Sequence, residues 1–394
     1  MLSIKELKKY YNNKRVLITG HTGFKGSYMC VLLKYLGAKV YGYSLKPEKN
    51  GLYELINKAV HNSLVTGETF ADIRDYKKLS AFVKKVKPDY VLHMAAQPLV
   101  LTGYEEPRYT YEVNVMGTVN LLEAIREIVG ANACRARMGE LCEPISILNV
   151  TTDKVYENND LSNYAFKEND KLCGRDPYAN SKSCSELVTY AYNKSFFTDK
   201  KIYRVSTARA GNVIGGGDLN KNRIIPDCYR SIKNKKQMII RNPKSIRPYQ
   251  FVLEPLILYL NIMAMQKKDK KYEGNYNIGP DKKACLTTEV LTEKFFNEWA
   301  HADGGSHSSP IRQALAPTGA RIVRPYTVAA SYASGKLHES KFLRLDNSLI
   351  KKIFKYKEIF SMDKTMKHTV KVYRDMLEKK NIYESILNII KTIE

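Results

Sequence analysis

Short apolar runs and stretches with helical spacing follow one another through the first half of the chain. Residues 15–19 form an apolar run, and in residues 27–36 the apolar side chains recur at helical spacing. Runs of the first kind predict buried strands, and the second pattern predicts helices. Further strands are predicted at 39–43, 90–97, 146–150 and 201–209, and further helices at 113–125 and 178–192. This alternation predicts an α/β fold with a doubly wound parallel sheet, and we expect Glu186 on the surface of the last helix.

Three glycines connect the first predicted strand to the first helix. Gly20, Gly23 and Gly26 lie between residues 15–19 and the helical stretch. Glycines let a backbone approach a pyrophosphate without a Cβ in the way, and the N–H groups at the start of the helix meet its negative charge. In this strand-to-helix context, the pattern predicts a dinucleotide site of the Rossmann type.

The residues after the next strands decide how a dinucleotide would be held. The second strand ends in Ser44 and Lys46, with no acid to bind the adenosine ribose, so both NAD and NADP stay open. Asp72 and Ile73 could flank the adenine, although Asp72 could equally cap a helix. Residues 95–96 are both alanine, which lets the backbone pass close to a ligand.

The pattern changes beyond residue 210. Loops and short helical segments replace the regular alternation, with Pro226 among them. We therefore expect a dinucleotide-binding Rossmann domain over residues 1–210. A smaller, mixed, substrate-binding domain is expected over residues 211–394, with some segments returning to the first domain.

Tyr178 and Lys182 lie one turn apart at the start of the last predicted helix. Side chains four positions apart share a face, so the ammonium favours the phenolate and lets Tyr178 titrate nearer neutrality. Such a pair can take a hydroxyl proton while a nicotinamide accepts the hydride, which is alcohol oxidation. The spacing is common by chance, so a surface Tyr and Lys would be the simpler interpretation without the cofactor turn upstream.

Thr152, Asp153 and Lys154 follow the strand predicted at 146–150. Open α/β sheets bind their ligands at the carboxyl ends of the strands. These three side chains therefore add a second hydroxyl, an acid and a base beside the Tyr178 and Lys182 pair.

Composition bears on the location of the protein. Of the 394 residues, 44% are hydrophobic, and no apolar run approaches the roughly 20 residues that span a bilayer. The first residues are not followed by a signal-type apolar stretch. Seven scattered cysteines without C-x-x-C spacing fit a reduced compartment and no zinc or other metal site. We expect a cytoplasmic protein with no membrane partner.

The formal net charge of +24 raises the question of an anionic partner. Lysines are spread along the whole chain, and no basic block interleaves with aromatics, so nucleic acid is not the expected partner. Attraction of a phosphate-bearing substrate explains the charge more simply. Arg223, Arg241 and Arg247 gather in a loop-rich region and could clamp a diphosphate, although ordinary surface arginines would give the same pattern.

These motifs, in this order, resemble the extended short-chain dehydrogenase/reductase superfamily and, within it, the CDP-glucose 4,6-dehydratase family. The wider resemblance rests on the glycine turn, on residues 95–98, on Asn114 with Gly117, and on the two catalytic motifs. The narrower one rests on segments 20–27, 96–100, 152–158, 208–218, 240–243 and 247–248. It covers residue 15 to about residue 266. Lys154 makes it specific, because other sugar-nucleotide dehydratases of the superfamily typically have Glu at this position.

The resemblance implies a mechanism. Tyr178 takes the C4 hydroxyl proton while NAD takes the C4 hydride, and Thr152 hydrogen-bonds the C4 oxygen. A neutral Lys154, or another base, removes the C5 proton, and a protonated Asp153 donates to the departing C6 hydroxyl. Hydride returns to C6 and gives a 4-keto-6-deoxy sugar.

The resemblance also implies ligand contacts and a homodimer formed through a four-helix contact that uses the helix carrying Leu121 and Leu122 and the helix at 178–192. The implied cofactor contacts are Gly20, Thr22, Gly23, Phe24, Gly26, Asp72, Ile73, Ala95, Ala96, Gln97, Asn114, Tyr178 and Lys182. The implied nucleotide-sugar contacts are Asn212, Arg223, Arg241, Arg247 and Gln250.

Two other functions stay open. An epimerase, or a dehydratase acting on another nucleotide, uses the same Tyr and Lys to oxidise C4; the Asp153 and Lys154 pair favours elimination, because an epimerase needs no acid for a leaving C6 hydroxyl. A nucleotide-binding regulatory or scaffold protein that retains the fold without turnover is the alternative from another class, and the complete catalytic set speaks against it.

Two stretches depart from the family pattern. Residues 130–143 stand where the family commonly passes quickly from helix to strand, and residues 301–335 contain no lysine in a chain otherwise rich in it. Each is expected to be an inserted surface loop or a segment of different origin.

Overall fold

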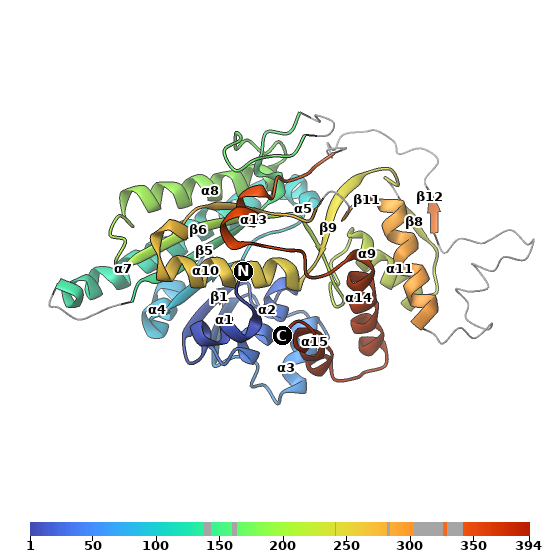
Figure 1. Cartoon of the computed structure of the whole chain (residues 1–394), viewed down its shortest axis with the longest axis horizontal. Helices are drawn as coiled ribbons and strands as arrows, with labels where there is room; N and C mark the ends of the chain where they lie inside the picture. The colour runs from blue at the N-terminus through green and yellow to red at the C-terminus, as the bar shows by residue number, and fades with distance from the viewer. Residues whose placement is uncertain (138–142, 160–163, 241, 282–283, 303–325, 329–341) are drawn as a thin grey trace, which may run out of the picture.

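A seven-stranded sheet forms the centre of the molecule in the computed structural model (Figure 1). The structure describes residues 1–137, 143–159, 164–240, 242–281, 284–302, 326–328 and 342–394. Strand order is β10-β6-β5-β4-β1-β2-β3, and every pairing in this sheet is parallel. Its strands are β1 (Arg15–Thr19), β2 (Lys39–Ser44), β3 (Gly67–Phe70), β4 (Tyr90–His93), β5 (Ile145–Thr152), β6 (Tyr203–Ala210) and β10 (Asn275–Ile278). The predicted doubly wound parallel sheet is confirmed.

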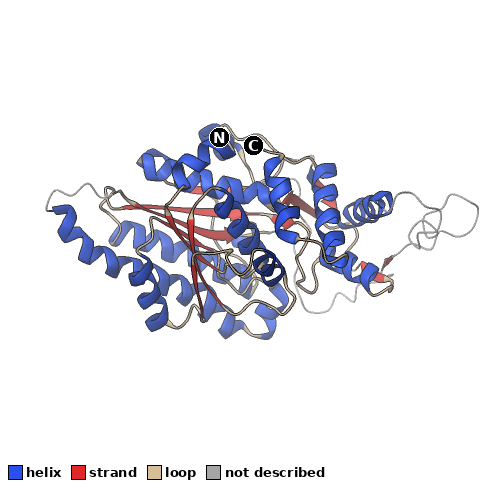
Figure 2. Ribbon diagram, turned by 90° about the horizontal axis from the view of Figure 1, so that it is seen from below, coloured by secondary structure: helices blue, strands red, loops and turns tan. Residues whose placement is uncertain are grey.

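Helices cover both faces of this sheet (Figure 2). Strand β1 shows why both faces need cover: Val16 and Ile18 belong to one buried apolar cluster and Leu17 belongs to the other. The first cluster includes side chains of α1 (Ile4–Tyr11), α2 (Phe24–Tyr35) and α10 (Leu253–Lys268). The second includes side chains of α4 (Tyr76–Val86) and α7 (Gly117–Arg137), and α8 (Pro177–Ser195) packs beside α7 and β5 on that face.

The direction of the chain through the sheet reverses next to β1. From β1 the chain moves outward through β2 and β3, then returns to β4 on the other side of β1 and continues to β5 and β6. Such a reversal opens a crevice at the carboxyl ends of the strands, where α/β proteins bind ligands. The glycine turn after β1 and the segment after β4 lie at that crevice.

The part of the chain after residue 210 builds a second apolar core. It contains side chains of α9 (Ile224–Lys233), α11 (Thr288–Ala302) and α14 (Met362–Leu377). Two small sheets accompany these helices: β7 (Asn212–Ile214), β9 (Ile246–Phe251) and β11 (Cys285–Thr287) form one, and β8 (Met238–Ile240) and β12 (Tyr326–Val328) form the other. Strand β10 lies at the edge of the main sheet. A domain boundary near residue 210 stays a prediction.

The remaining elements connect or cover these layers. They include α3 (Leu52–Ala59), α5 (Val100–Glu105), α6 (Pro107–Tyr111), α13 (Ser348–Phe354) and α15 (Ile382–Lys391). Helix α15 packs on α2 and α3, so the end of the chain supports the helix that follows the glycine turn (Figure 1). Within the described ranges, no helix has the length and apolar character that crossing a membrane requires. The cytoplasmic location stays a prediction.

The structure describes parts of the two atypical stretches. Helix α7 continues to Arg137, so the expectation of a loop over 130–143 is wrong for residues 130–137. Alanine and arginine are strong helix formers and recur in this segment, which explains its helicity. In the second stretch, α11 extends to Ala302, and residues 326–328 pair with β8. Residues 138–142, 303–325 and 329–335 lie outside the described residues.

Candidate active site

The glycine turn brings the end of β1 against the segment after β4. Gly20 has a φ of 78°, and a Cβ on it would lie 2.8 Å from the Ala95 backbone nitrogen. A Cβ on Gly26 would lie 2.3 Å from the Gly20 carbonyl oxygen. Gly23 caps the start of α2 with only one backbone oxygen near a Cβ position, at 3.5 Å. The positive end of the helix therefore faces a narrow, Cβ-free cradle of the kind a pyrophosphate needs.

The far end of this crevice is built by the residues after β2 and β3. The Thr22 hydroxyl lies 2.8 Å from the Ser44 hydroxyl and donates to the Leu45 carbonyl. Ile73 is buried, and its side chain lies where a Cβ on Gly117 would be, at 2.7 Å. These contacts fix the positions of residues predicted to hold the adenosine.

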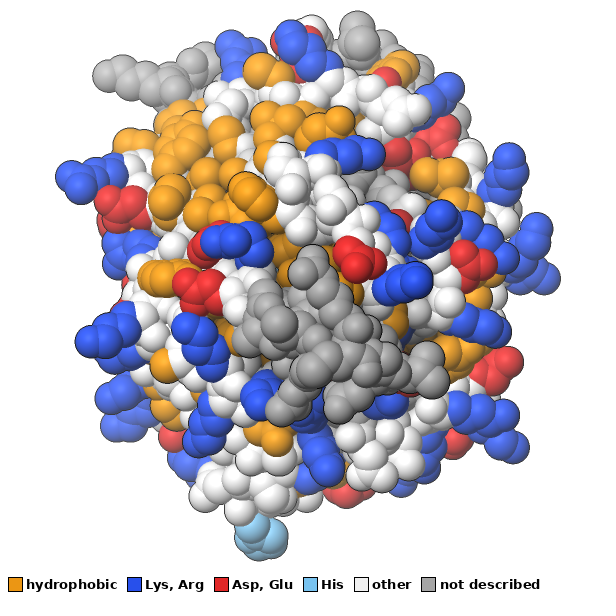
Figure 3. Space-filling view, turned by 90° about the vertical axis from the view of Figure 1, so that its left-hand side faces the viewer, with side chains coloured by type: hydrophobic (Ala, Val, Ile, Leu, Met, Phe, Trp, Pro, Cys, Tyr) orange, Lys and Arg blue, Asp and Glu red, His pale blue; other side chains and the backbone are white. Residues whose placement is uncertain are grey.

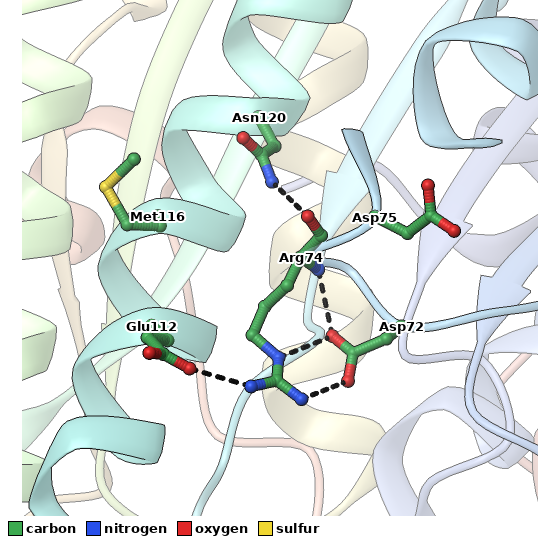
Figure 4. A pocket seen from close by; sticks show the side chains of 6 residues that line it. All are labelled: Asp72, Arg74, Asp75, Glu112, Met116 and Asn120. Carbon is green, nitrogen blue, oxygen red and sulfur yellow. Dashed lines mark hydrogen bonds and ion pairs between the residues drawn. The ribbon is translucent and has the colours of Figure 1, made fainter. Parts of the chain in front are cut away.

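Asp72 is held by an arginine at a surface pocket (Figure 4). Arg74 donates to both Asp72 carboxylate oxygens, at 3.1 and 3.0 Å, and to Glu112 at 2.7 Å. The helix-cap alternative for Asp72 is wrong, because Asp75 caps α4 by accepting from the Lys78 N–H at 3.0 Å. The adenine contact of Asp72 stays a prediction.

Gln97 and Asn114 are buried and bonded to each other. The Gln97 N–H donates to the Asn114 side-chain oxygen at 2.8 Å, and the Asn114 amide donates to the Gln97 carbonyl at 3.1 Å and to the Ser181 hydroxyl at 2.9 Å. Ser181 is on α8, three residues after Tyr178. In this structure the two residues therefore join the segment after β4 to the catalytic helix, and their cofactor contacts stay a prediction.

Strand β5 delivers the acid and the base in one short turn. Asp153 begins a turn of 3-10 helix over Asp153–Val155 and is only 1% exposed. One of its oxygens accepts from the Thr152 hydroxyl at 3.0 Å and lies 3.3 Å from the Lys154 ammonium. The other oxygen, Oδ2, is buried and has no hydrogen-bond partner among the described residues. It points toward Gly211, where a Cβ would lie 3.6 Å away. Asp153 thus keeps one oxygen free for a ligand.

Tyr178 is buried beside this turn. Burial raises its pKa, against the lowering effect of the Lys154 charge and of the hydrogen bond with Thr152. The expectation that Lys182 brings Tyr178 nearer neutrality is therefore wrong for the protein alone: the pKa of Tyr178 is raised, and Lys154 is the cation that lowers it most. Sequence spacing gave the proximity of the two side chains but could not give their burial.

Lys182 is buried one turn further along α8. Its ammonium donates to the Val150 carbonyl of β5 at 3.1 Å. Burial lowers its pKa to about 8, and the Glu186 carboxylate opposes that shift. His93 lies nearby, and burial together with the Lys182 charge lowers its pKa to about 3, so it is neutral.

Two charged residues of the site were missed by sequence reasoning. Lys25, inside the glycine turn, has a pKa lowered to about 8 by burial and by the charges of Arg223 and Lys182, with Asp153 acting in the opposite direction. The signal was present, since the turn carries a lysine between Gly23 and Gly26. Glu186 is the other: it is 3% exposed and paired with Arg209, so its expected place on the surface is wrong.

The predicted substrate residues are placed as follows. Arg223 donates to Asp218 at 3.0 Å and lies within electrostatic range of Lys25 and Tyr178. Arg247 is buried on β9 and donates to the Ile246 carbonyl.

Three more substrate predictions concern Asn212, Gln250 and Arg241. Asn212 is half-buried on β7, beside Tyr249. Gln250 is buried on β9, and its Oε1 has no hydrogen-bond partner among the described residues. Arg241 lies outside the described residues. The diphosphate clamp stays a prediction. In the part of the chain that the structure describes, no group of three or more His, Cys, Asp or Glu could hold a metal ion.

The parallel sheet, the glycine cradle and the Tyr178 and Lys182 pair at the ends of its strands define a dinucleotide-binding enzyme of the extended short-chain dehydrogenase/reductase type. Solved structures agree with this fold. UDP-glucose-4-epimerase from Stenotrophomonas maltophila superposes with a TM-score of 0.70 at 19% identity, over 93% of this chain and 99% of that one. dTDP-glucose 4,6-dehydratase from Bacillus anthracis, solved with NAD, gives 0.66 at 18% identity, over 94% and 99%.

Sequence comparison narrows the class to a family. Residues 17–369 match the profile of GDP-mannose 4,6 dehydratase. The chain is also 40% identical over 311 residues to CDP-glucose 4,6-dehydratase of Salmonella typhimurium, which covers 76% of this chain and 82% of that protein. The chain belongs to the CDP-glucose 4,6-dehydratase family of nucleotide-sugar dehydratases, as the resemblance implied. It is an enzyme of the hydro-lyase class.

Proposed function

We propose that this enzyme converts CDP-glucose, with NAD as its cofactor, to CDP-4-keto-6-deoxyglucose and water. The observation that carries the proposal is the Asp153 and Lys154 turn beside Tyr178. Elimination needs an acid for the departing C6 hydroxyl, and Asp153 offers a buried oxygen that has no hydrogen-bond partner in the part of the chain that the structure describes. An epimerase has no use for such an acid.

The residues around the crevice fit a dinucleotide. Gly20, Gly23 and Gly26 leave room for the pyrophosphate at the start of α2, and Lys25 adds a cation there. Phe24 is the first residue of that helix. When bound, NAD supplies an acceptor for the C4 hydride, which is later returned to C6. The absence of an acid after β2 leaves the ribose contact to Ser44 and Thr22, and membership of the family favours NAD over NADP.

Tyr178 is the base that removes the proton of the C4 hydroxyl. The residue needs its phenolate for this step, and the Lys154 charge and the Thr152 hydrogen bond both favour the phenolate. Thr152 can also donate to the C4 oxygen and orient the sugar. Loss of the C4 hydrogen gives a 4-keto group, which makes the neighbouring C5 hydrogen acidic.

The elimination is shared by Lys154 and Asp153. Their side chains lie 3.3 Å apart, so one proton moved from the ammonium to the carboxylate yields a neutral amine and a carboxylic acid. The amine takes the C5 proton, the C5–C6 double bond forms, and the C6–O bond breaks. Asp153 gives its proton to the departing hydroxyl, which leaves as water. The two side chains end as the ion pair in which they began. When the hydride returns to C6, C5 takes up a proton that exchanges with solvent, which balances the proton that Tyr178 removed from the C4 hydroxyl.

The nucleotide diphosphate is assigned to the cations on the other side of the crevice. Arg223 and Lys25 lie within electrostatic range of one another, and Arg247 is on the neighbouring β9. Guanidinium and ammonium groups bind phosphate oxygens strongly. The choice of cytosine rests on family membership.

The test is turnover of a panel of nucleotide-glucose compounds by the purified enzyme with NAD. We expect the base-dependent ultraviolet absorbance of a 4-keto-6-deoxy product, strongest with CDP-glucose. Turnover of another nucleotide-glucose alone would correct the base, formation of a 4-epimer would support the epimerase, and no product from any of them would contradict the dehydratase function.

A homodimer through α7 and α8 is part of the proposal. Helix α8 exposes Leu187 and Tyr190, which are 53% and 61% exposed, and Phe196 and Met116 are also exposed. Figure 3 shows hydrophobic side chains gathered on the upper part of the end of the molecule where α7 and α8 lie. Monomeric proteins rarely expose apolar patches of this kind, which favours burial against a second copy.

A further inference from the structure

Glu186 and Arg209 form a buried ion pair directly behind the active site. Arg209 is 1% exposed and Glu186 is 3% exposed. The guanidinium donates from Nε and Nη2 to the two carboxylate oxygens, at 3.0 Å each. The Thr151 hydroxyl donates to Oε1 of Glu186, which also accepts from Nε of Arg209. The Thr207 hydroxyl donates to the other carboxylate oxygen, Oε2, at 2.7 Å. The pair thereby joins α8, β5 and β6 through a bidentate, fully bonded contact.

The same pair holds the catalytic turn on both sides. Thr151, which donates to Glu186, is the residue before Thr152. The third guanidinium nitrogen of Arg209 donates to the Tyr156 hydroxyl at 2.8 Å, and Tyr156 is the residue after the Asp153–Val155 turn. The turn that carries the acid and the base is therefore anchored at its two ends by one ion pair.

Glu186 is also placed to act on Lys182. The two residues are four positions apart on α8 and so share a face. Lys182 donates to the Val150 carbonyl, next to Thr151, so both side chains fasten α8 to the last residues of β5. Burial favours the neutral amine of Lys182, and the Glu186 carboxylate favours its ammonium.

We propose that the Glu186 and Arg209 pair is the positioning unit of this active site: it fixes both ends of the turn that carries Asp153 and Lys154, and it places a carboxylate one helical turn from Lys182. Neither residue touches the substrate in this scheme. The proposal rests on the proposed function only for its kinetic readout.

The pH dependence follows from the groups around Lys182. With Glu186 neutralised, the pKa of Lys182 falls below its value of about 8, so the ammonium is lost at a lower pH. The other titratable groups in range do not reverse this direction. His93 on β4 is neutral, Tyr178 on α8 has a raised pKa, and Lys25 on α2 is a cation that pushes the same way. Arg209 on β6 is paired with Glu186 itself.

The test is the variant Glu186→Gln, which keeps the shape of the side chain and removes its charge. We expect kcat with CDP-glucose to fall about 100-fold. The alkaline limb of the pH profile should move about 1 unit lower, with little change in KM. NAD affinity, followed by equilibrium dialysis across the same pH range, should be lost at correspondingly lower pH. An unmoved alkaline limb in both readouts would overturn the proposal.

Two further variants keep the test decisive. Glu186→Gln leaves Arg209 buried without its counter-ion and could therefore fail to fold. In that case the double variant Glu186→Gln with Arg209→Met removes both charges. Its alkaline limb should move in the same direction. Asp375→Asn removes another buried carboxylate, on α14, and should lower stability without moving the alkaline limb. Because NAD binding is measured directly, a wild type inactive on CDP-glucose would contradict the proposed function and still leave the positioning role tested.

Discussion

At the scale of single residues, the chemistry depends on how burial and charge oppose each other around Tyr178. Burial raises the pKa of the phenol, and the cation that lowers it most is Lys154 rather than Lys182. Lys154 therefore serves two steps in the proposed mechanism: its ammonium favours the phenolate during oxidation, and its amine accepts the C5 proton during elimination. Lys154, the residue that made the family resemblance specific, is therefore also the residue that prepares the base.

Oxidation and elimination can be separated by two variants. Tyr178→Phe should lower turnover by about 100- to 10,000-fold with no reduced cofactor formed, because the C4 proton has no acceptor. Asp153→Asn should still oxidise C4 but release water slowly, so reduced cofactor should accumulate in a single-turnover absorbance experiment. Normal turnover by Tyr178→Phe would exclude it as the base, and the same spectrum from both variants would refute the division of roles.

Lys25 is expected to bind phosphate. Its ammonium lies in the glycine turn, near Arg223 and Lys182. A charged hydrogen bond is worth about 1.5–3 kcal/mol, so Lys25→Met should weaken NAD or nucleotide-sugar binding by about 10- to 100-fold. Separate titrations of the two ligands decide which one it contacts. The exposed Lys5→Met serves as the control, and unchanged affinity for both ligands in Lys25→Met would remove Lys25 from the site.

At the scale of the elements, sequence patterns predicted the sheet better than the catalytic helix. Strands β1, β4 and β5 bury apolar side chains on both faces, so short apolar runs in the sequence predicted them. Helix α8 buries Ser181, Ser183 and Ser185 instead of large apolar residues, so hydrophobic periodicity gave no sign of which face is inside. That is why Glu186 was expected on the surface and why its partner Arg209, far away in sequence, was not found.

Glu254, near the start of α10, is expected to make the free energy of unfolding depend on pH. It is buried and accepts from the Tyr356 hydroxyl at 2.8 Å and from the backbone of residues 359 and 360. Burial raises its pKa to about 7. A carboxyl group whose pKa is higher in the folded than in the unfolded protein stabilises the fold at pH values below its unfolded pKa. That contribution is lost as the pH rises through the folded pKa of about 7.

We therefore expect the free energy of unfolding to fall by the order of 2–3 kcal/mol between about pH 5 and pH 8 because of this group. Glu254→Gln should flatten that dependence. Denaturant titrations of both proteins across this range check it. Equal slopes for variant and wild type would show that Glu254 does not titrate there.

At the scale of the whole molecule, the proposed site draws on both cores. The main sheet carries the glycine cradle and the catalytic turn, and the part after residue 210 carries Arg223, Arg247 and Gln250, whose substrate contacts are proposed. The family and the fold could be predicted because local motifs carry them. The substrate side could be predicted only in part, because its residues come from segments whose arrangement depends on packing between the two cores.

The proposed dimer surface gives a prediction at this scale. Leu187→Asp with Tyr190→Lys should convert the dimer to a monomer, because charges replace the apolar side chains expected at the contact. Light scattering after size-exclusion chromatography measures the mass. Ile239→Lys, at an exposed apolar residue of β8, is the matched control and should stay dimeric. An unchanged mass for the double variant would place the contact elsewhere.

The central claim is the elimination of water by Lys154 and Asp153, and the product formed in heavy water tests it most directly. The C5 hydrogen is removed by Lys154 and replaced from exchangeable protons. Mass spectrometry should therefore show a nucleotide sugar that has lost one water and carries deuterium at C5. A product of unchanged mass, as from epimerisation, or a dehydrated product without deuterium at C5 would contradict the account.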